Sequence, residues 1–215
     1  MMEYQPLQYI YEPAGMEAAT TLLLLHGTGG DETDLIPLSR QFGKGFNVLS
    51  LRGNVSEGGM PRFFKRLGMG IFDEQDLAFR THEMVAFIRS LSAKEGFDPA
   101  KVVALGYSNG ANIAGSALLL YPDFLAGAIL YRPMHPFKNA EAFAKRAPSL
   151  EMKPTPVFIS NGAADPTINP TAAKAYSDLL TREGFAVESH LLPTSHHLTQ
   201  QDVQLSVDWF NRNFG

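Results

Sequence analysis

One stretch decides how this chain folds: Val102-Val103-Ala104-Leu105-Gly106-Tyr107-Ser108-Asn109-Gly110-Ala111. A short apolar run leads into Gly-x-Ser-x-Gly, and a segment of small and apolar residues, Ala111–Leu120, follows it. This order predicts a buried strand, a tight turn that presents Ser108, and a helix. So tight a turn requires small residues on both sides of the serine, and Gly106 and Gly110 meet that need. A plain glycine-rich turn is the alternative.

Similar apolar runs recur on both sides of that stretch, each stopped by glycine, proline or a polar residue, and amphipathic segments lie between them. Runs that are apolar on both faces and alternate with helices predict an α/β fold, with a mostly parallel sheet covered by helices on both sides. Leu7–Tyr11 is a candidate edge strand. The expected strands are Thr20–Leu25, Asn47–Leu51, Lys101–Leu105, Ala126–Tyr131, Pro156–Ser160 and Ala186–Leu192. The expected helices are a segment with Leu77, Met84, Val85, Ile88 and Leu91 on one face, Ala111–Leu120, Thr171–Glu183 and Gln200–Phe214.

Composition narrows the classes of protein that fit. The length of 215 residues predicts a single domain over residues 1–215, and a net charge of −4 argues against a nucleic-acid partner. With no cysteine, disulfides, thiolate metal sites and cysteine nucleophiles are excluded. Residues 1–15 show no signal-peptide pattern, and the apolar run Leu22–Leu25 is too short to span a bilayer. We therefore expect a soluble cytoplasmic protein without stable membrane insertion.

A serine hydroxyl needs a base to become a nucleophile, and that base is usually a histidine held by a carboxylate. Asp165 follows the run Pro156–Ser160, where an orienting acid belongs, although an Asx turn before Pro166 would also explain it. His196 and His197 follow the last run. We predict that His196 is the base and His197 a bystander. A metal pair is the alternative, but adjacent histidine side chains diverge and no carboxylate cluster accompanies them.

Acyl transfer also needs hydrogen-bond donors for an oxyanion. We expect one from the backbone N–H of Asn109, directly after the serine, and the other from Thr28 in the loop His26-Gly27-Thr28-Gly29-Gly30. Binding of a phosphate by these glycines would require a lysine at Walker-type spacing, which the sequence lacks. His26 itself is interpreted as structural.

The stretch Gly53–Glu74 has no clear period, and we expect a long loop there that is either functional or a surface excursion anchored by its aromatic residues. Part of it, with a later segment, is the candidate wall of an apolar substrate pocket. The predicted pocket residues are Phe63, Phe64, Met69, Met134 and Phe137.

Taken together, these motifs resemble the phospholipase/carboxylesterase branch of the α/β-hydrolases, which includes acyl-protein thioesterases. The resemblance covers nearly the whole chain: Leu23–Glu32, Arg52–Val55, Met60–Phe64, Gly106–Ala111, Asp165-Pro166 and His196–Thr199. Arg-Gly-Asn at 52–54 and Pro-Arg-Phe-Phe at 61–64 look most like a bacterial carboxylesterase subgroup. Members commonly have glycine before the histidine, where this chain has Ser195.

The resemblance implies a serine hydrolase without metal or cofactor that cleaves small-molecule carboxylic or thioesters. Its catalytic residues would be Ser108, Asp165 and His196. We see no separate lid domain in 215 residues, so we expect a modest pocket that takes short to medium acyl chains. Two alternatives stay open: a lysophospholipase or acyl-protein thioesterase, and a ligand-binding protein of this fold with low turnover. Many members of the family are homodimers, so a homodimer is a candidate assembly.

Overall fold

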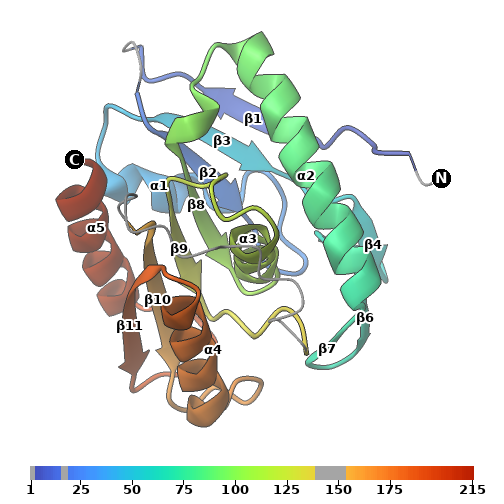
Figure 1. Cartoon of the computed structure of the whole chain (residues 1–215), viewed down its shortest axis with the longest axis vertical. Helices are drawn as coiled ribbons and strands as arrows, with labels where there is room; N and C mark the ends of the chain where they lie inside the picture. Colours follow the sequence, from blue (N-terminus) through green and yellow to red (C-terminus); the bar gives the residue numbers. More distant parts are fainter. Residues whose placement is uncertain (1–2, 16–18, 139–153) are drawn as a thin grey trace.

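A computed structural model describes residues 3–15, 19–138 and 154–215 of the chain. Seven strands form one sheet in the order β1-β3-β2-β8-β9-β10-β11 (Figure 1). All are paired in parallel except β1, which runs antiparallel to β3 at the edge. The strands are β1 Tyr9–Glu12, β2 Thr21–Leu25, β3 Asn47–Leu51, β8 Val102–Tyr107, β9 Gly127–Tyr131, β10 Pro156–Gly162 and β11 Ala186–Leu192. The prediction of a mostly parallel sheet is confirmed.

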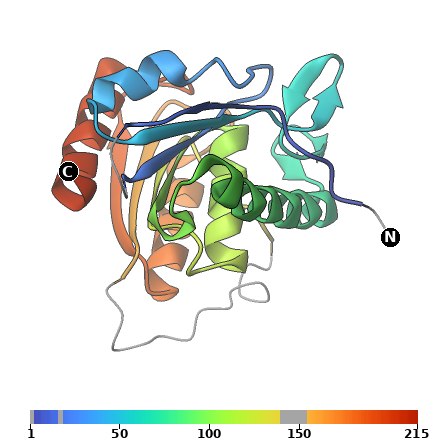
Figure 2. The same cartoon turned by 90° about the horizontal axis from the view of Figure 1, so that it is seen from above.

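Helices cover both faces of this sheet (Figure 2). On one face lie α2 (Glu74–Glu95), α3 (Asn109–Leu120) and α4 (Pro170–Arg182); on the other lie α1 (Ile36–Ser39), the short 3₁₀ helix η1 (Arg40–Phe42) and α5 (Gln200–Phe214). A second 3₁₀ turn, η2 (Pro99–Lys101), precedes β8.

Alternation along each strand divides the core into two layers. On β2, for example, Leu23 and Leu25 pack with α2, α3 and α4, whereas Leu22 and Leu24 pack with Trp209 and Phe210 of α5. Successive strand side chains point to opposite faces, so a strand covered on both sides must be apolar throughout. This is why the central strands β2, β8 and β9 appear in the sequence as nearly unbroken apolar runs, whereas the edge strand β11 carries Glu188, Ser189 and His190.

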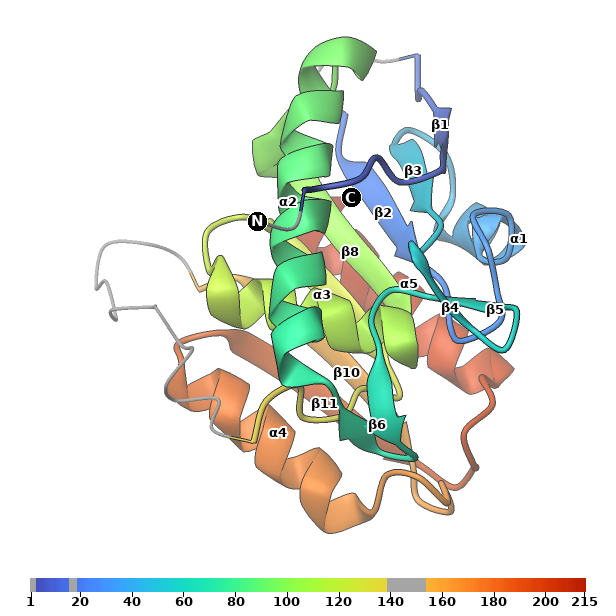
Figure 3. The same cartoon turned by 90° about the vertical axis from the view of Figure 1, so that its right-hand side faces the viewer.

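The prediction of an unstructured loop over Gly53–Glu74 is wrong. This stretch forms two small antiparallel ribbons, β4 (Val55–Glu57) with β5 (Met60–Arg62), and β6 (Arg66–Gly68) with β7 (Ile71–Phe72). Strands of two or three residues are too short to show a period in the sequence. Figure 3 shows the ribbons beyond the ends of β2 and β3, next to the start of α2.

Parallel strands bring their carboxyl ends to one edge of the sheet, and ligands of such sheets bind beyond that edge. Ser108, Arg132, Asp165 and His196 each follow a strand that ends there, namely β8, β9, β10 and β11. The topology therefore gathers side chains from distant parts of the chain at one place.

Candidate active site

Ser108 occupies a strained turn between β8 and α3. Its backbone has φ 52° and ψ −110°, a conformation that residues other than glycine rarely adopt. The flanking glycines are required by space. A Cβ at Gly110 would lie 1.9 Å from the carbonyl oxygen of Leu25, and one at Gly106 would lie 2.6 Å from the backbone nitrogen of Ala111. The predicted strand–turn–helix arrangement is therefore present, and it holds the Ser108 hydroxyl at the sheet edge.

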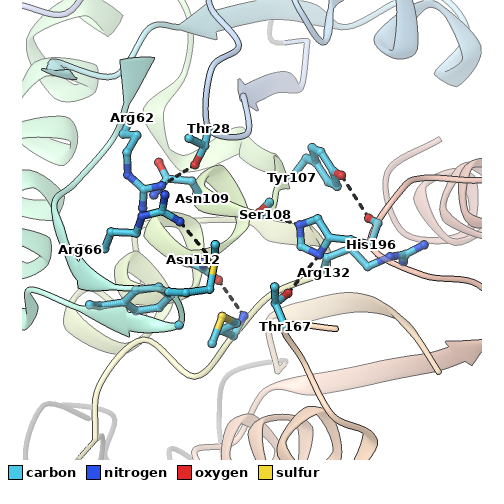
Figure 4. A pocket seen from close by; sticks show the side chains of 14 residues that line it. Thr28, Arg62, Arg66, Tyr107, Ser108, Asn109, Asn112, Arg132, Thr167 and His196 are labelled. Atoms are coloured by element: carbon cyan, nitrogen blue, oxygen red, sulfur yellow. Dashed lines mark hydrogen bonds between the residues drawn. The ribbon is translucent and has the colours of Figure 1, made fainter. Parts of the chain in front are cut away.

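The structure brings Ser108, His196 and Asp165 into one series of hydrogen bonds. Figure 4 shows the contact between Ser108 and His196. His196 Nε2 lies 2.9 Å from Ser108 Oγ, and His196 Nδ1 lies 2.7 Å from Asp165 Oδ2. With the Nδ1 proton donated to the carboxylate, Nε2 is free to accept the proton of the serine hydroxyl. Nucleophile, base and orienting acid thus have the geometry that acyl transfer requires.

His197 contacts neither Ser108 nor Asp165. Its Nδ1 lies 3.1 Å from Ser195 Oγ and its Nε2 lies 3.2 Å from Thr194 Oγ1, both within its own loop. The two adjacent histidines thus diverge, as expected for neighbouring side chains.

Asp165 is buried but well supplied with donors. Its side chain is 0% exposed, and its Oδ1 accepts hydrogen bonds from the amide and hydroxyl of Thr167 at 2.8 and 2.7 Å. Burial acts to raise the pKa of Asp165, but the hydrogen bonds from Thr167 and His196 outweigh it and lower the pKa below its usual value. The carboxylate therefore stays ionised beside the imidazole. Thr167 is a part of the site that the sequence analysis missed.

The two residues predicted to donate backbone N–H groups to an oxyanion, Thr28 and Asn109, both line the cavity beside Ser108. Asn109 is the first residue of α3, whose opening amides have no partner within the helix, and the Ser108 side chain does not cap them. The loop with Thr28 lies across the cavity, and Arg62 Nη1 donates to Thr28 Oγ1 at 2.5 Å, which fixes that loop (Figure 4). Thr28 and Asn109 are therefore both placed at the site.

Arg132 is the main residue that the sequence analysis missed. It directly follows β9, has a φ of 55°, and is fully buried. It donates to both carboxylate oxygens of Asp202 at 2.8 Å, and also to the carbonyl oxygens of Ser195 and His197 at 3.2 and 2.9 Å. These two carbonyls flank His196, so Arg132 holds the histidine loop in place. An arginine directly after a fully apolar strand was the available signal, because a buried charge must be paired.

A cavity of about 300 Å³ opens next to Ser108. Met69 and Met134 line it, as do Arg62, Arg66, Asn112 and the catalytic candidates Ser108 and His196. Met69 lies at the mouth, since it is 71% exposed.

Three of the predicted pocket residues do not line this cavity, and that part of the prediction is wrong. Phe63, Phe64 and Phe137 are buried in the core layer beside α2, α3 and α4. Phe63 packs on the ring of His26, and Phe64 packs edge-on against Phe72. Burying an aromatic side chain in the adjacent core is more favourable than leaving it exposed at an open polar cavity, so these rings turn inward.

His26 also has a structural place. Its Nε2 accepts the N–H of Gly53 at 3.1 Å, and its Nδ1 lies 2.6 Å from the carbonyl oxygen of Gly27. The ring therefore joins the loop after β2 to the loop after β3, and His26 does not line the cavity beside Ser108.

Among the residues that the structure describes, no group of three or more histidine, aspartate or glutamate side chains could hold a metal ion. Over the same ranges, no helix combines the length and apolar character needed to cross a bilayer.

Comparison with known proteins agrees with this architecture. The sequence profile of the phospholipase/carboxylesterase family matches residues 8–211. The putative hydrolase MhqD of Bacillus subtilis is 40% identical over 204 residues, which are 95% of this chain and 98% of that protein. The crystal structure of a Bacillus cereus carboxylesterase superposes with a TM-score of 0.87 at 38% identity, covering 97% of this chain and 95% of that one. A carboxylesterase from Mesorhizobium loti gives a TM-score of 0.82 at 30% identity, covering 97% and 99%.

Proposed function

The chain belongs to the phospholipase/carboxylesterase family of α/β-hydrolases and is a hydrolase of the carboxylesterase type, and we propose that it cleaves esters through a covalent acyl–enzyme intermediate on Ser108. The observation that carries the proposal is the chain of hydrogen bonds from Ser108 Oγ through His196 to Asp165. A protein that only binds a ligand does not need a serine, a histidine and an aspartate joined by hydrogen bonds. Their presence therefore favours turnover over a binding role.

In the proposed mechanism, Ser108 Oγ attacks the ester carbonyl while His196 Nε2 takes the hydroxyl proton. Asp165 holds the ring through Nδ1 and stabilises its charged form. The backbone N–H groups of Asn109 and Thr28 donate to the developing oxyanion. His196 then returns the proton to the leaving alcohol, and water, activated by the same imidazole, hydrolyses the acyl–enzyme and frees Ser108.

The substrate we propose is a small ester with a short to medium acyl chain. A cavity of about 300 Å³ lies at the lower end of the range for small-molecule sites, and its lining mixes arginine, asparagine and methionine. Thioesters react by the same steps. Lysophospholipids and acylated proteins carry long chains, and the cavity beside Ser108 supports them less well.

The direct kinetic test is hydrolysis of 4-nitrophenyl butyrate by wild-type protein and the Ser108→Ala variant. Loss of the nucleophile lowers the rate by several orders of magnitude in serine hydrolases, roughly 10⁶-fold in a well-studied case. We expect a comparable loss here. Ser56→Ala, which removes an exposed hydroxyl of β4 outside the cavity lining, is the matched control and should keep wild-type turnover. A Ser108→Ala variant with more than about a tenth of wild-type activity would refute the mechanism.

A further inference from the structure

The cavity beside Ser108 is rich in hydrogen-bond donors and positive charge. Its charged lining residues, apart from His196, are Arg62, Arg66 and Arg132, and none of the described residues that line it is an aspartate or glutamate. Figure 4 shows Arg62 and Arg66 together on one side of Ser108, with His196 and Arg132 on the other. The mechanism above uses neither Arg62 nor Arg66 on the substrate.

The positive charge of Arg132 is already balanced. Its guanidinium is fully buried and makes two hydrogen bonds to the Asp202 carboxylate, which is also fully buried. Arg132 is thus part of a closed ion pair, and its remaining donors hold backbone carbonyls.

Arg62 and Arg66 share a single carboxylate between them. Glu57 Oε1 accepts from Arg66 Nε and Nη2 at 2.9 and 2.8 Å, and Glu57 Oε2 lies 3.3 Å from Arg62 Nε. Two guanidinium groups against one carboxylate leave an excess of one positive charge at the cavity wall. The Glu57 side chain is 38% exposed, so water screens much of its effect.

Arg62 is the more costly of the two charges to bury. Its side chain is only 3% exposed. Burial lowers the pKa of Arg62, the like charge of Arg66 lowers it further, and Glu57 opposes both. Its other contacts, the Phe64 carbonyl and the Thr28 hydroxyl, are neutral. An anion bound in the cavity would supply the missing negative charge.

An uncharged donor on the same lining, the Asn109 amide, has no acceptor among the described residues. Asn109 is 2% exposed, and its Oδ1 accepts the N–H of Phe63 at 2.7 Å, which identifies the other terminal atom as the amide nitrogen. That nitrogen, Asn109 Nδ2, is buried, and no residue within 3–15, 19–138 or 154–215 accepts a hydrogen bond from it. Buried donors are nearly always paired in native proteins, so one left open beside a cavity points to an acceptor on a ligand.

Arg66 is poised to reach such a ligand. In the part of the chain that the structure describes, its Nη1 has one hydrogen-bond partner, the sulfur of Met69 at 3.5 Å, and a thioether is a weak acceptor. A carboxylate would replace this contact with a charge-assisted hydrogen bond, which is about twice as strong as a neutral one.

From these observations we infer that Arg62, Arg66 and the Asn109 amide form an anion subsite, and that the preferred substrates are esters that carry a second, unreacting carboxylate. The inference rests on the proposed ester hydrolysis at Ser108 and specifies its substrate class. The carboxylate would lie against the arginines while the ester carbonyl lies against Ser108.

The test compares esters that differ only in that charge. For an anion on the acyl side, mono-(4-nitrophenyl) adipate is paired with 4-nitrophenyl 6-methylheptanoate, in which methyl groups replace the carboxylate oxygens. For an anion on the alcohol side, 4-(butyryloxy)phenylacetate is paired with its uncharged amide. We expect wild-type kcat/KM to favour the anionic member of at least one pair by tenfold or more. Raising the salt concentration should reduce this preference, because the mouth of the cavity is open to solvent.

Arg66→Gln should reduce the preference by about tenfold. Arg66 is the better position to change, because Arg62 also fixes the Thr28 loop. Arg40→Gln is the matched control: it removes the same charge from a side chain that is 60% exposed and lies outside the cavity lining, so the preference should not change.

The possible failures can be told apart. If wild-type protein hydrolyses the neutral esters through Ser108 but shows no preference for the anionic ones, or if Arg66→Gln retains the full preference, the anion subsite is refuted and the esterase proposal stands. If no ester is hydrolysed, the esterase proposal fails. Calorimetric titration with adipate then still tests the anion subsite. The subsite predicts that wild-type protein binds adipate at least tenfold more tightly than Arg66→Gln does. Equal affinities, or no binding by wild type, would refute it.

Discussion

At the scale of single residues, the two adjacent histidines are clearly distinguished. Both ring nitrogens of His196 face the proposed catalytic partners, whereas the ring nitrogens of His197 lie within hydrogen-bonding distance of Ser195 and Thr194. We therefore predict that His196→Ala removes nearly all ester hydrolysis, since no other base lies within hydrogen-bond reach of Ser108 in the part of the chain that is described. His197→Ala should lower kcat/KM by about tenfold or less, the effect of a lost supporting contact. A variant at His197 that is inactive, beside a nearly normal variant at His196, would reverse the assignment; circular dichroism controls for folding.

His26 makes a prediction about stability and pH. Burial lowers the pKa of His26 below 6.5 in the folded protein, despite the opposing hydrogen bond to the Gly27 carbonyl. The unfolded chain then binds more protons than the folded one below about pH 6.5, so the contribution of His26 to stability is present above that pH and is lost as the pH falls towards its folded pKa. His26→Gln cannot titrate. We expect urea unfolding at pH 7.5 and 5.0 to show a smaller loss of unfolding free energy for this variant than for wild type. An equal loss in both proteins would contradict the prediction.

At the scale of secondary-structure elements, the Arg132–Asp202 ion pair joins the end of β9 to the start of α5. Asp202 also accepts from the amide and hydroxyl of Thr199 and so completes the capping box of α5. Removing one charge of a buried pair leaves the other uncompensated, at a cost of about 3–5 kcal/mol. Asp202→Asn should lower the free energy of unfolding by roughly that amount. Asp208→Asn, an exposed change on the same helix, should cost less than about 0.5 kcal/mol. Similar losses of unfolding free energy for the two variants would show that the ion pair does not stabilise the packing of α5.

Elements with a strong periodic signal could be predicted from the sequence, and those without one could not. The run Thr20–Leu25 predicted a strand because burial on both faces leaves an unbroken apolar signal. Ala186–Leu192, which is more exposed, was recognised as a run that Pro193 ends. The ribbons β4–β7 have strands of two or three residues and leave none. Phe63 and Phe64 could be recognised as apolar anchors, but the sequence does not tell whether such rings face a cavity or the core beside it.

At the scale of the whole molecule, one sheet joins β1 near the N-terminus to β11 near the C-terminus, and we infer that the described residues fold as a single unit. The order of the chemistry along the chain was predictable, since Ser108, Asp165 and His196 each follow an apolar run that became a strand of this sheet. The role of Arg132 was not, because its partner Asp202 lies 70 residues away and only the tertiary fold brings the two together.

The size of the cavity makes a prediction about acyl length. Each added methylene contributes about 0.8 kcal/mol only while the pocket can bury it, and a cavity of about 300 Å³ fills quickly. We expect kcat/KM for a series of 4-nitrophenyl esters to peak at short to medium chains and to fall for palmitate. A preference for palmitate over butyrate would instead support a long-chain thioesterase or lipase.

The most direct test of the central claim, that Ser108 is the nucleophile, is covalent labelling with a fluorophosphonate followed by intact-mass analysis and peptide mapping. The arrangement of Ser108, His196 and Asp165 predicts a single adduct, located on Ser108, that forms in the wild-type protein and is absent from Ser108→Ala. An adduct on another residue, or equal labelling of the two proteins, would contradict the account.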